Sequence, residues 1–122
     1  MKMAGVMLGS DDPKKLGEFY TKVFGEPQMR EDEWYGFFLG QAGLMVGRHS
    51  EVKGKNDTPG RIIFMVTSED FKTDADRIKG LGAEVVAEPY QPDKDRDPDT
   101  WLATFADPDG NYFQLCTPWK GM

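Results

Sequence analysis

The sequence is poor in the residues that most often bind metals or act as nucleophiles. Among its 122 residues are one cysteine, Cys116, and one histidine, His49. A single cysteine excludes an intrachain disulfide and suits a reducing compartment. No apolar run approaches the roughly 20 residues of a membrane-spanning helix, and residues 1–3 lead directly into a predicted strand rather than a signal peptide. We therefore expect a cytoplasmic protein with no membrane association.

Basic residues are also scarce relative to acidic ones. The chain has 15 Lys and Arg against 21 Asp and Glu, which gives a formal net charge of -6. This balance argues against nucleic acid as a partner and favours cationic molecules. The length suits one domain with one core, so we expect residues 1–122 to form a single domain.

Apolar spacing predicts the order strand, helix and three strands, repeated twice. The first module covers about residues 1–58 and the second about 59–122. In the first module, the helix begins at Pro13, and Asp12 before it is the predicted N-cap. The predicted strands are 3–9, 27–31, 34–39 and 43–49 in the first module and 61–67, 83–89, 100–106 and 111–116 in the second, where the helix is 68–79.

The most specific local pattern is Asp107-Pro108-Asp109-Gly110, which lies between two alternating apolar runs. It predicts a hairpin with a three-residue loop that Gly110 closes. This hairpin and the repeated module resemble the vicinal-oxygen-chelate superfamily, which includes glyoxalase I, ring-cleaving dioxygenases and bleomycin-resistance proteins, over essentially the whole chain. The resemblance implies an α+β fold in which two βαβββ modules form an open, incomplete β-barrel with the helices outside.

Strand alternation then separates a helix-facing side from a cavity-lining side. We align residues 38–43 with 105–110, so that both hairpins have the same register. The residues predicted to lie against the helices include Phe38, Ile62, Phe105 and Phe113. The residues predicted to line a ligand cavity are Met7, Tyr35, Phe37, Met45, His49, Arg61, Ile63, Met65, Thr104, Tyr112 and Gln114.

The resemblance also implies four metal-ligand positions, which fall on Gly5, Gly47, Arg61 and Gln114. Relatives that use a metal generally have a Glu ligand where this chain has Gln114. Glycine has no side-chain donor, Arg does not lose its proton, and one neutral amide oxygen does not hold a transition metal or zinc. We therefore expect no metal and no cofactor.

Several residues keep two interpretations. Arg61 either extends its head group to water or clamps a carboxylate, phosphate or enolate oxygen. His49 is either a residue at a strand end or a general base, and Cys116 is either a small buried side chain or a nucleophile. The methionines and aromatic residues either line an adaptable pocket or pack a core or dimer interface.

The predicted function is metal-independent binding of a small hydrophobic or aromatic compound with a polar head, as in the glyoxalase and bleomycin-resistance type. The alternatives are a lyase, isomerase or dioxygenase-like enzyme of the same superfamily, and a protein that functions only by association. Relatives commonly pair modules across a twofold axis, so a homodimer is expected.

Overall fold

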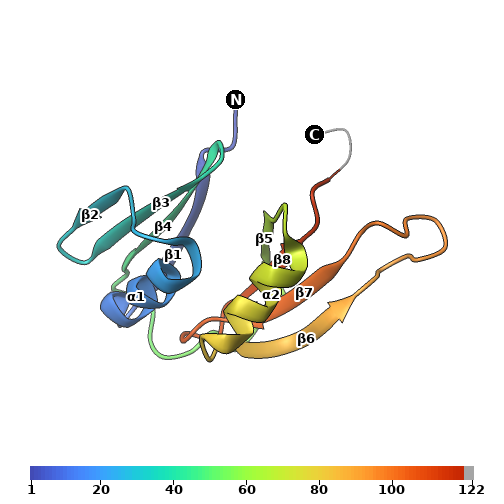
Figure 1. Cartoon of the computed structure of the whole chain (residues 1–122). Helices are drawn as coiled ribbons and strands as arrows, with labels where there is room; N and C mark the ends of the chain where they lie inside the picture. The colour runs from blue at the N-terminus through green and yellow to red at the C-terminus, as the bar shows by residue number, and fades with distance from the viewer. Residues whose placement is uncertain (120–122) are drawn as a thin grey trace. The chain divides into compact units, whose positions relative to one another are not determined.

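The computed structural model describes residues 1–119, which form two compact units, Met1–Asn56 and Asp57 onward. Each unit has the order strand, helix and three strands (Figure 1). Unit 1 contains β1 (Gly5–Ser10), α1 (Pro13–Phe24), β2 (Met29–Glu31), β3 (Trp34–Leu39) and β4 (Ala42–Arg48). Unit 2 contains β5 (Phe64–Thr67), α2 (Phe71–Gly80), β6 (Glu84–Tyr90), β7 (Leu102–Ala106) and β8 (Tyr112–Cys116). The boundary between the units follows Asn56, two residues before the predicted boundary at about residue 58. That the two units together form a single domain stays a prediction.

The two sheets have the same topology. In unit 1 the strand order is β1-β4-β3-β2, and in unit 2 it is β5-β8-β7-β6. The first strand of each unit runs parallel to the last, and the other pairs are antiparallel. Helix α1 packs against β1, β3 and β4, whereas α2 packs against β6 and β8. Each unit is therefore a mixed sheet with a helix on one face, as the sequence predicted.

The turn before each helix uses the same hydrogen bond. The Ser10 hydroxyl accepts the backbone N–H of Asp12 at 2.9 Å, and the Ser68 hydroxyl accepts that of Asp70 at 3.1 Å. Both serines are buried, and both aspartates are the N-caps of their helices. Helix α2 begins at Phe71 rather than at residue 68 because residues 68–70 form this turn. The equivalent turns provide a fixed point for comparing the two units.

The core of unit 1 lies between α1 and the sheet. Leu16, Tyr20 and Val23 of the helix are buried, as are Leu44 and Val46 of β4. These helical residues follow the spacing of an amphipathic helix. Burial of this stripe against the sheet is the main stabilising contribution in the unit.

The core of unit 2 is aromatic. The centroid of the Phe113 ring lies 5.7 Å from the centroids of the Phe64 and Phe105 rings. Ala75 and Ile78 of α2 are also buried. Phe64, Phe105 and Phe113 are also partners across three adjacent strands. The helix-facing assignment of Phe105 and Phe113 from the sequence agrees with their burial.

The predicted register of the β3–β4 hairpin was wrong. Leu39 pairs with Ala42, so the turn contains only Gly40 and Gln41, with Gly40 at a positive φ of 67°. The β7–β8 hairpin instead has the expected three-residue loop, in which the Asp107 N–H donates to the Asn111 carbonyl. Because side chains alternate along a strand, the different loop length exchanges the two faces of β3.

Three assignments change as a result. Tyr35 and Phe37 were predicted to line the cavity, but both are buried on the helix side. A Cβ on Gly17 of α1 would lie within 2.4 Å of the Tyr35 ring, and the Phe37 ring lies 6.2 Å from that of Phe24. Phe38 was assigned to the core, yet it is 57% exposed on the opposite face.

Strand β5 is shorter than the predicted strand 61–67. The Arg61 N–H donates to the Thr58 carbonyl at 3.1 Å in a turn, and pairing with β8 begins only at Phe64. Ile62 was expected in the core but is 76% exposed. Arg61 is therefore a turn residue near the end of the sheet rather than a strand residue.

Candidate functional site

The face of the unit 1 sheet opposite α1 presents methionine and aromatic side chains above glycines. Met7 pairs with Met45 across β1 and β4, and Met45 pairs with Gly36 of β3, which pairs with Met29 of β2. Cross-strand partners project from the same face, so the three methionines form one row. We call this surface the open face of unit 1.

Two aromatic rings flank the methionine row on this open face. A Cβ on Gly47 would lie within 2.4 Å of the Trp34 ring, so the indole covers Gly47 directly. The Phe38 ring lies beside Gly43 in the same way, with ordinary van der Waals spacing. Trp34, Phe38 and Met29 were absent from the predicted site. The alternation of Trp34, Gly36 and Phe38 would have identified this face if the β3–β4 turn had been predicted to contain two residues instead of three.

The open face of unit 2, opposite α2, has a hydrogen-bonded polar pair beside a methionine. Met65 pairs with Gln114 across β5 and β8, and Gln114 pairs with Thr104 of β7. The Gln114 amide Nε2 donates to the Thr104 hydroxyl at 3.1 Å. The Thr104 side chain is buried, and that of Gln114 is half-buried. Thr104 thereby holds the Gln114 amide in place, which leaves the amide oxygen able to accept a further hydrogen bond and the second N–H of Nε2 able to donate one.

Cys116 is the last residue of β8, the strand that contains Gln114, and its thiol is not accessible to solvent. It is buried, and its Sγ lies 3.5 Å from the Val66 carbonyl, to which the thiol donates. Burial raises the pKa of the Cys116 thiol, while the Trp119 side chain opposes this shift by hydrogen bonding. A buried thiol with a raised pKa is a poor nucleophile, so this site gives no support to nucleophilic catalysis.

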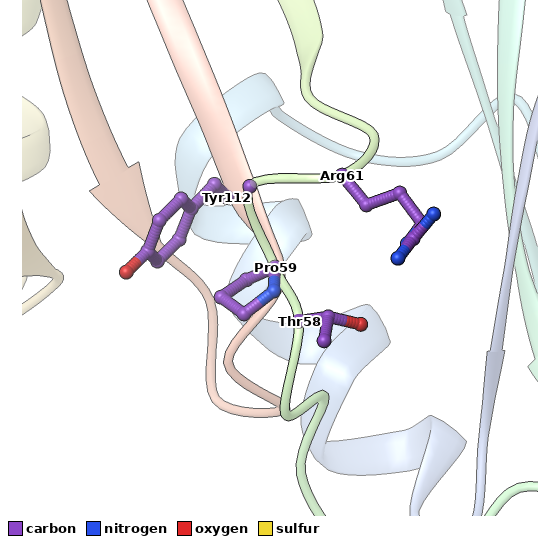
Figure 2. A pocket seen from close by; sticks show the side chains of 5 residues that line it. Thr58, Pro59, Arg61 and Tyr112 are labelled. Atoms are coloured by element: carbon purple, nitrogen blue, oxygen red, sulfur yellow. The ribbon is translucent and has the colours of Figure 1, made fainter.

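Arg61 and Tyr112 line a hollow of about 490 Å³ that is open to solvent, together with Thr58, Pro59 and Gly60. Figure 2 shows that the side chains of Arg61 and Tyr112 extend to opposite sides of the 58–61 segment. Arg61 is exposed and Tyr112 is half-buried. A guanidinium in this position can meet an anionic group at the edge of the hollow, but the two side chains do not converge on one ligand atom.

The remaining predicted residues lie at the margins of the two sheets. His49 follows β4 and is exposed, and its Nδ1 accepts the N–H of Glu51 at 3.2 Å. This nitrogen helps to form the turn after β4, which favours the strand-end interpretation over a general base. Ile63 is half-buried one residue before β5, and its alternation with Met65 places it on the open face of unit 2.

The structure also changes which positions are equivalent in the two units. Met7 lies five residues before the Asp12 N-cap, and Met65 lies five residues before the Asp70 N-cap. Their parallel-strand partners are Met45 and Gln114, so Met45, rather than Gly47, corresponds to Gln114.

The donors at these positions do not fit the metals of the superfamily's enzymes. They are neutral thioethers and one amide, whereas zinc, nickel, iron and manganese require imidazole, thiolate or carboxylate ligands. Within residues 1–119, no group of three or more His, Cys, Asp or Glu side chains is placed to hold a metal ion. We therefore derive no reaction step through such a metal.

Comparison with solved structures identifies the same fold over nearly the whole chain. A glyoxalase-related enzyme from Fulvimarina pelagi is 18% identical with a TM-score of 0.74, and the match covers 97% of this chain and 88% of that one. Lactoylglutathione lyase from Agrobacterium tumefaciens is 20% identical with a TM-score of 0.70, covering 95% and 92%. The fosfomycin resistance protein FosX from Listeria monocytogenes is 18% identical with a TM-score of 0.70, covering 98% and 92%.

The paired βαβββ units and these structural matches show a glyoxalase/bleomycin-resistance-like α+β fold. Residues 5–116 match the model of the glyoxalase-like domain, so the chain belongs to that family and, with it, to the vicinal-oxygen-chelate superfamily. A search of curated proteins finds no match. In the part of the chain that the structure describes, no helix is both long and apolar enough to cross a membrane.

Proposed function

We propose that this glyoxalase-like protein binds a small hydrophobic or aromatic compound with a polar head and does so without a metal. The observation that carries this proposal is the composition of the open faces. Each presents methionine beside either aromatic rings or a fixed polar group, although a sheet face of a monomeric domain is usually polar when it is not covered. Such a mixture of adaptable apolar side chains and few polar groups is typical of ligand sites.

On the open face of unit 2, the apolar part of the compound would contact Met65 and Ile63. On the open face of unit 1, Met7 and Met45 would offer apolar contacts of the same kind. Unbranched thioether side chains adopt many rotamers, so they can fit ligands of differing shape. Tyr35 and Phe37 are excluded from this proposal because they lie in the core of unit 1.

The polar head would contact the Gln114 amide, which Thr104 holds in position by a hydrogen bond of 3.1 Å. Tyr112 precedes Gln114 by two residues on β8 and therefore projects from the same face. Arg61 at the neighbouring hollow would interact with an anionic head. His49 has a smaller expected contribution because its Nδ1 is already engaged.

A second candidate is an enzyme of the lyase, isomerase or dioxygenase type, and the match to lactoylglutathione lyase favours it. In this chain the available chemistry would be polarisation of a carbonyl group by neutral hydrogen-bond donors. Binding and catalysis share the same residues in this scheme. Turnover of a bound compound, lost in Gln114→Ala, would select the enzyme.

Two related fluorescent probes test the binding proposal. Anilinonaphthalene sulfonate is an aromatic compound with an anionic head, and N-phenylnaphthylamine is its counterpart without the sulfonate. We expect both to bind, and Met65→Ala to weaken both because it removes apolar contact. Gln114→Ala should weaken the sulfonate by about twofold to tenfold, the range of a neutral hydrogen bond.

Arg61→Ala is the matched test for the head group. It should weaken binding of the sulfonate but leave N-phenylnaphthylamine unchanged, and by about tenfold or more if the guanidinium forms a charged hydrogen bond. Phe113→Ala provides the folding control, since it should lower stability while the remaining folded protein still binds. Normal binding of both probes by Met65→Ala, Gln114→Ala and Arg61→Ala would overturn the proposed site.

A further inference from the structure

The methionine row on the open face of unit 1 has a chemistry that the binding of an organic compound does not use. Three of the chain's seven methionines, Met7, Met29 and Met45, lie in this row. We propose that their three thioether sulfurs form a site for one soft monovalent ion, Cu(I) or Ag(I). This proposal does not depend on the proposed function, although Met7 and Met45 take part in both.

Gly36 permits the methionines to approach one another. It lies between Met45 and Met29 in the cross-strand row. The Met45 Sδ is 3.1 Å and the Met29 Cε is 3.4 Å from the point that a Cβ on Gly36 would occupy. Both thioether ends therefore converge above this glycine, in space that any other residue would fill. Met7 is the parallel-strand neighbour of Met45 on β1, so its side chain projects from the same face on the other side of Met45.

Thioether sulfur determines which ion this row can bind. It is a neutral, polarisable donor, and such soft ligands select Cu(I) over the harder divalent ions. Ag(I) has the same closed-shell configuration and charge. A methionine side chain has three rotatable bonds, so the sulfurs can adjust to the ion without movement of the strands.

The surroundings of the row favour a cation. Trp34 covers Gly47, which follows Met45 by two residues on β4, so the indole borders the row. The face of an indole ring attracts a cation electrostatically. Glu31 is the cross-strand partner of Trp34, and its side chain therefore projects from the same face. Both groups would lower the energy of a positive charge above the methionines.

Thioether coordination also predicts an unusual response to pH. Binding at cysteine or histidine requires loss of a proton and weakens in acid. A thioether has no proton to lose in this range, so affinity for Ag(I) should be the same at pH 5 and pH 7. This comparison distinguishes the methionine row from binding at His49 or Cys116.

The experiment uses Ag(I), which undergoes no redox change, and the full chain carrying Cys116→Ser to remove the thiol. Native mass spectrometry should show one Ag(I) per chain, and competition titration gives the affinity. Met7→Leu, Met29→Leu and Met45→Leu should each lower that affinity by about tenfold or more, because even loss of an outer-sphere partner has effects of this size at metal sites.

Met65→Leu is the matched control, since Met65 lies on the other sheet and pairs with Gln114. It should leave Ag(I) binding unchanged. Leucine conserves size and apolar character, and circular dichroism verifies the fold of each variant. The proposal is overturned if the Cys116→Ser protein binds no Ag(I), if binding survives all three substitutions in the row, or if it disappears at pH 5. These results leave the two-probe test of organic-ligand binding unaffected.

Discussion

Phe37 and Phe38 are consecutive residues of β3 whose substitution should have opposite consequences. Phe37 is 1% exposed and lies against the Phe24 ring of α1, whereas Phe38 is 57% exposed on the open face. Phe37→Ala removes a buried ring and leaves a cavity between the helix and the sheet, which costs about 3 to 5 kcal/mol. That loss is a large share of the roughly 5 to 15 kcal/mol by which a domain is stable.

Urea unfolding followed by circular dichroism measures the difference. With a typical slope of about 2 kcal/mol per molar urea, Phe37→Ala should lower the unfolding midpoint by about 1.5 to 2.5 M. Phe38→Ala should change the free energy of unfolding by no more than about 0.5 kcal/mol, as is usual at the surface. Equal losses in both variants, or a larger loss in Phe38→Ala, would refute the two-residue turn and the assignment of faces that depends on it.

Three further outcomes are expected. Zinc, nickel, iron and manganese should be absent in stoichiometric amounts from the purified protein, and adding them should leave the melting temperature unchanged; near-equimolar metal whose removal lowers stability would contradict the ligand assignment. Light scattering at micromolar concentration should show a homodimer of about 28 kDa, twice the 13.8 kDa chain, and a 14 kDa species would exclude it. Hydrogen bonding from Arg48 lowers the pKa of Glu33 below the ordinary carboxyl pKa of 4.5. The stability that this pair contributes is therefore fully present above the ordinary pKa and is lost as the pH falls through the lowered pKa. Glu33→Gln should reduce this acid-side loss in unfolding experiments, and an unchanged pH profile would show that the pair does not contribute.

The order of the elements could be predicted from the sequence because each unit contains clear local signals. Pro13 after Asp12 fixes the start of the first helix, and Asp107-Pro108-Asp109-Gly110 specifies its hairpin through turn chemistry alone. The buried, helix-facing position of Phe113 could also be predicted, since its strand alternates and the turn residues indicate the length of the preceding loop. These features depend only on neighbouring residues.

The faces of β3 could not be obtained in this way. Residues 34–39 are apolar or glycine throughout, so alternation gives no indication of which side is buried. Only the length of the following turn distinguishes Phe37 from Phe38, and Gly40-Gln41-Ala42-Gly43 permits either a two-residue or a three-residue loop. Alignment of the hairpin glycines selected the wrong one. The candidate site in unit 2 was less affected because the β7–β8 loop was assigned correctly.

The contact between Trp34 and Gly47 restricts how this protein can change. The indole occupies the space into which any side chain at residue 47 would extend, since even a methyl carbon would lie within 2.4 Å of the ring. A carboxylate or imidazole introduced there would first have to displace the tryptophan from the sheet. Any side chain at residue 47 therefore requires a second substitution that reduces the ring at residue 34, and each change alone is expected to be unfavourable.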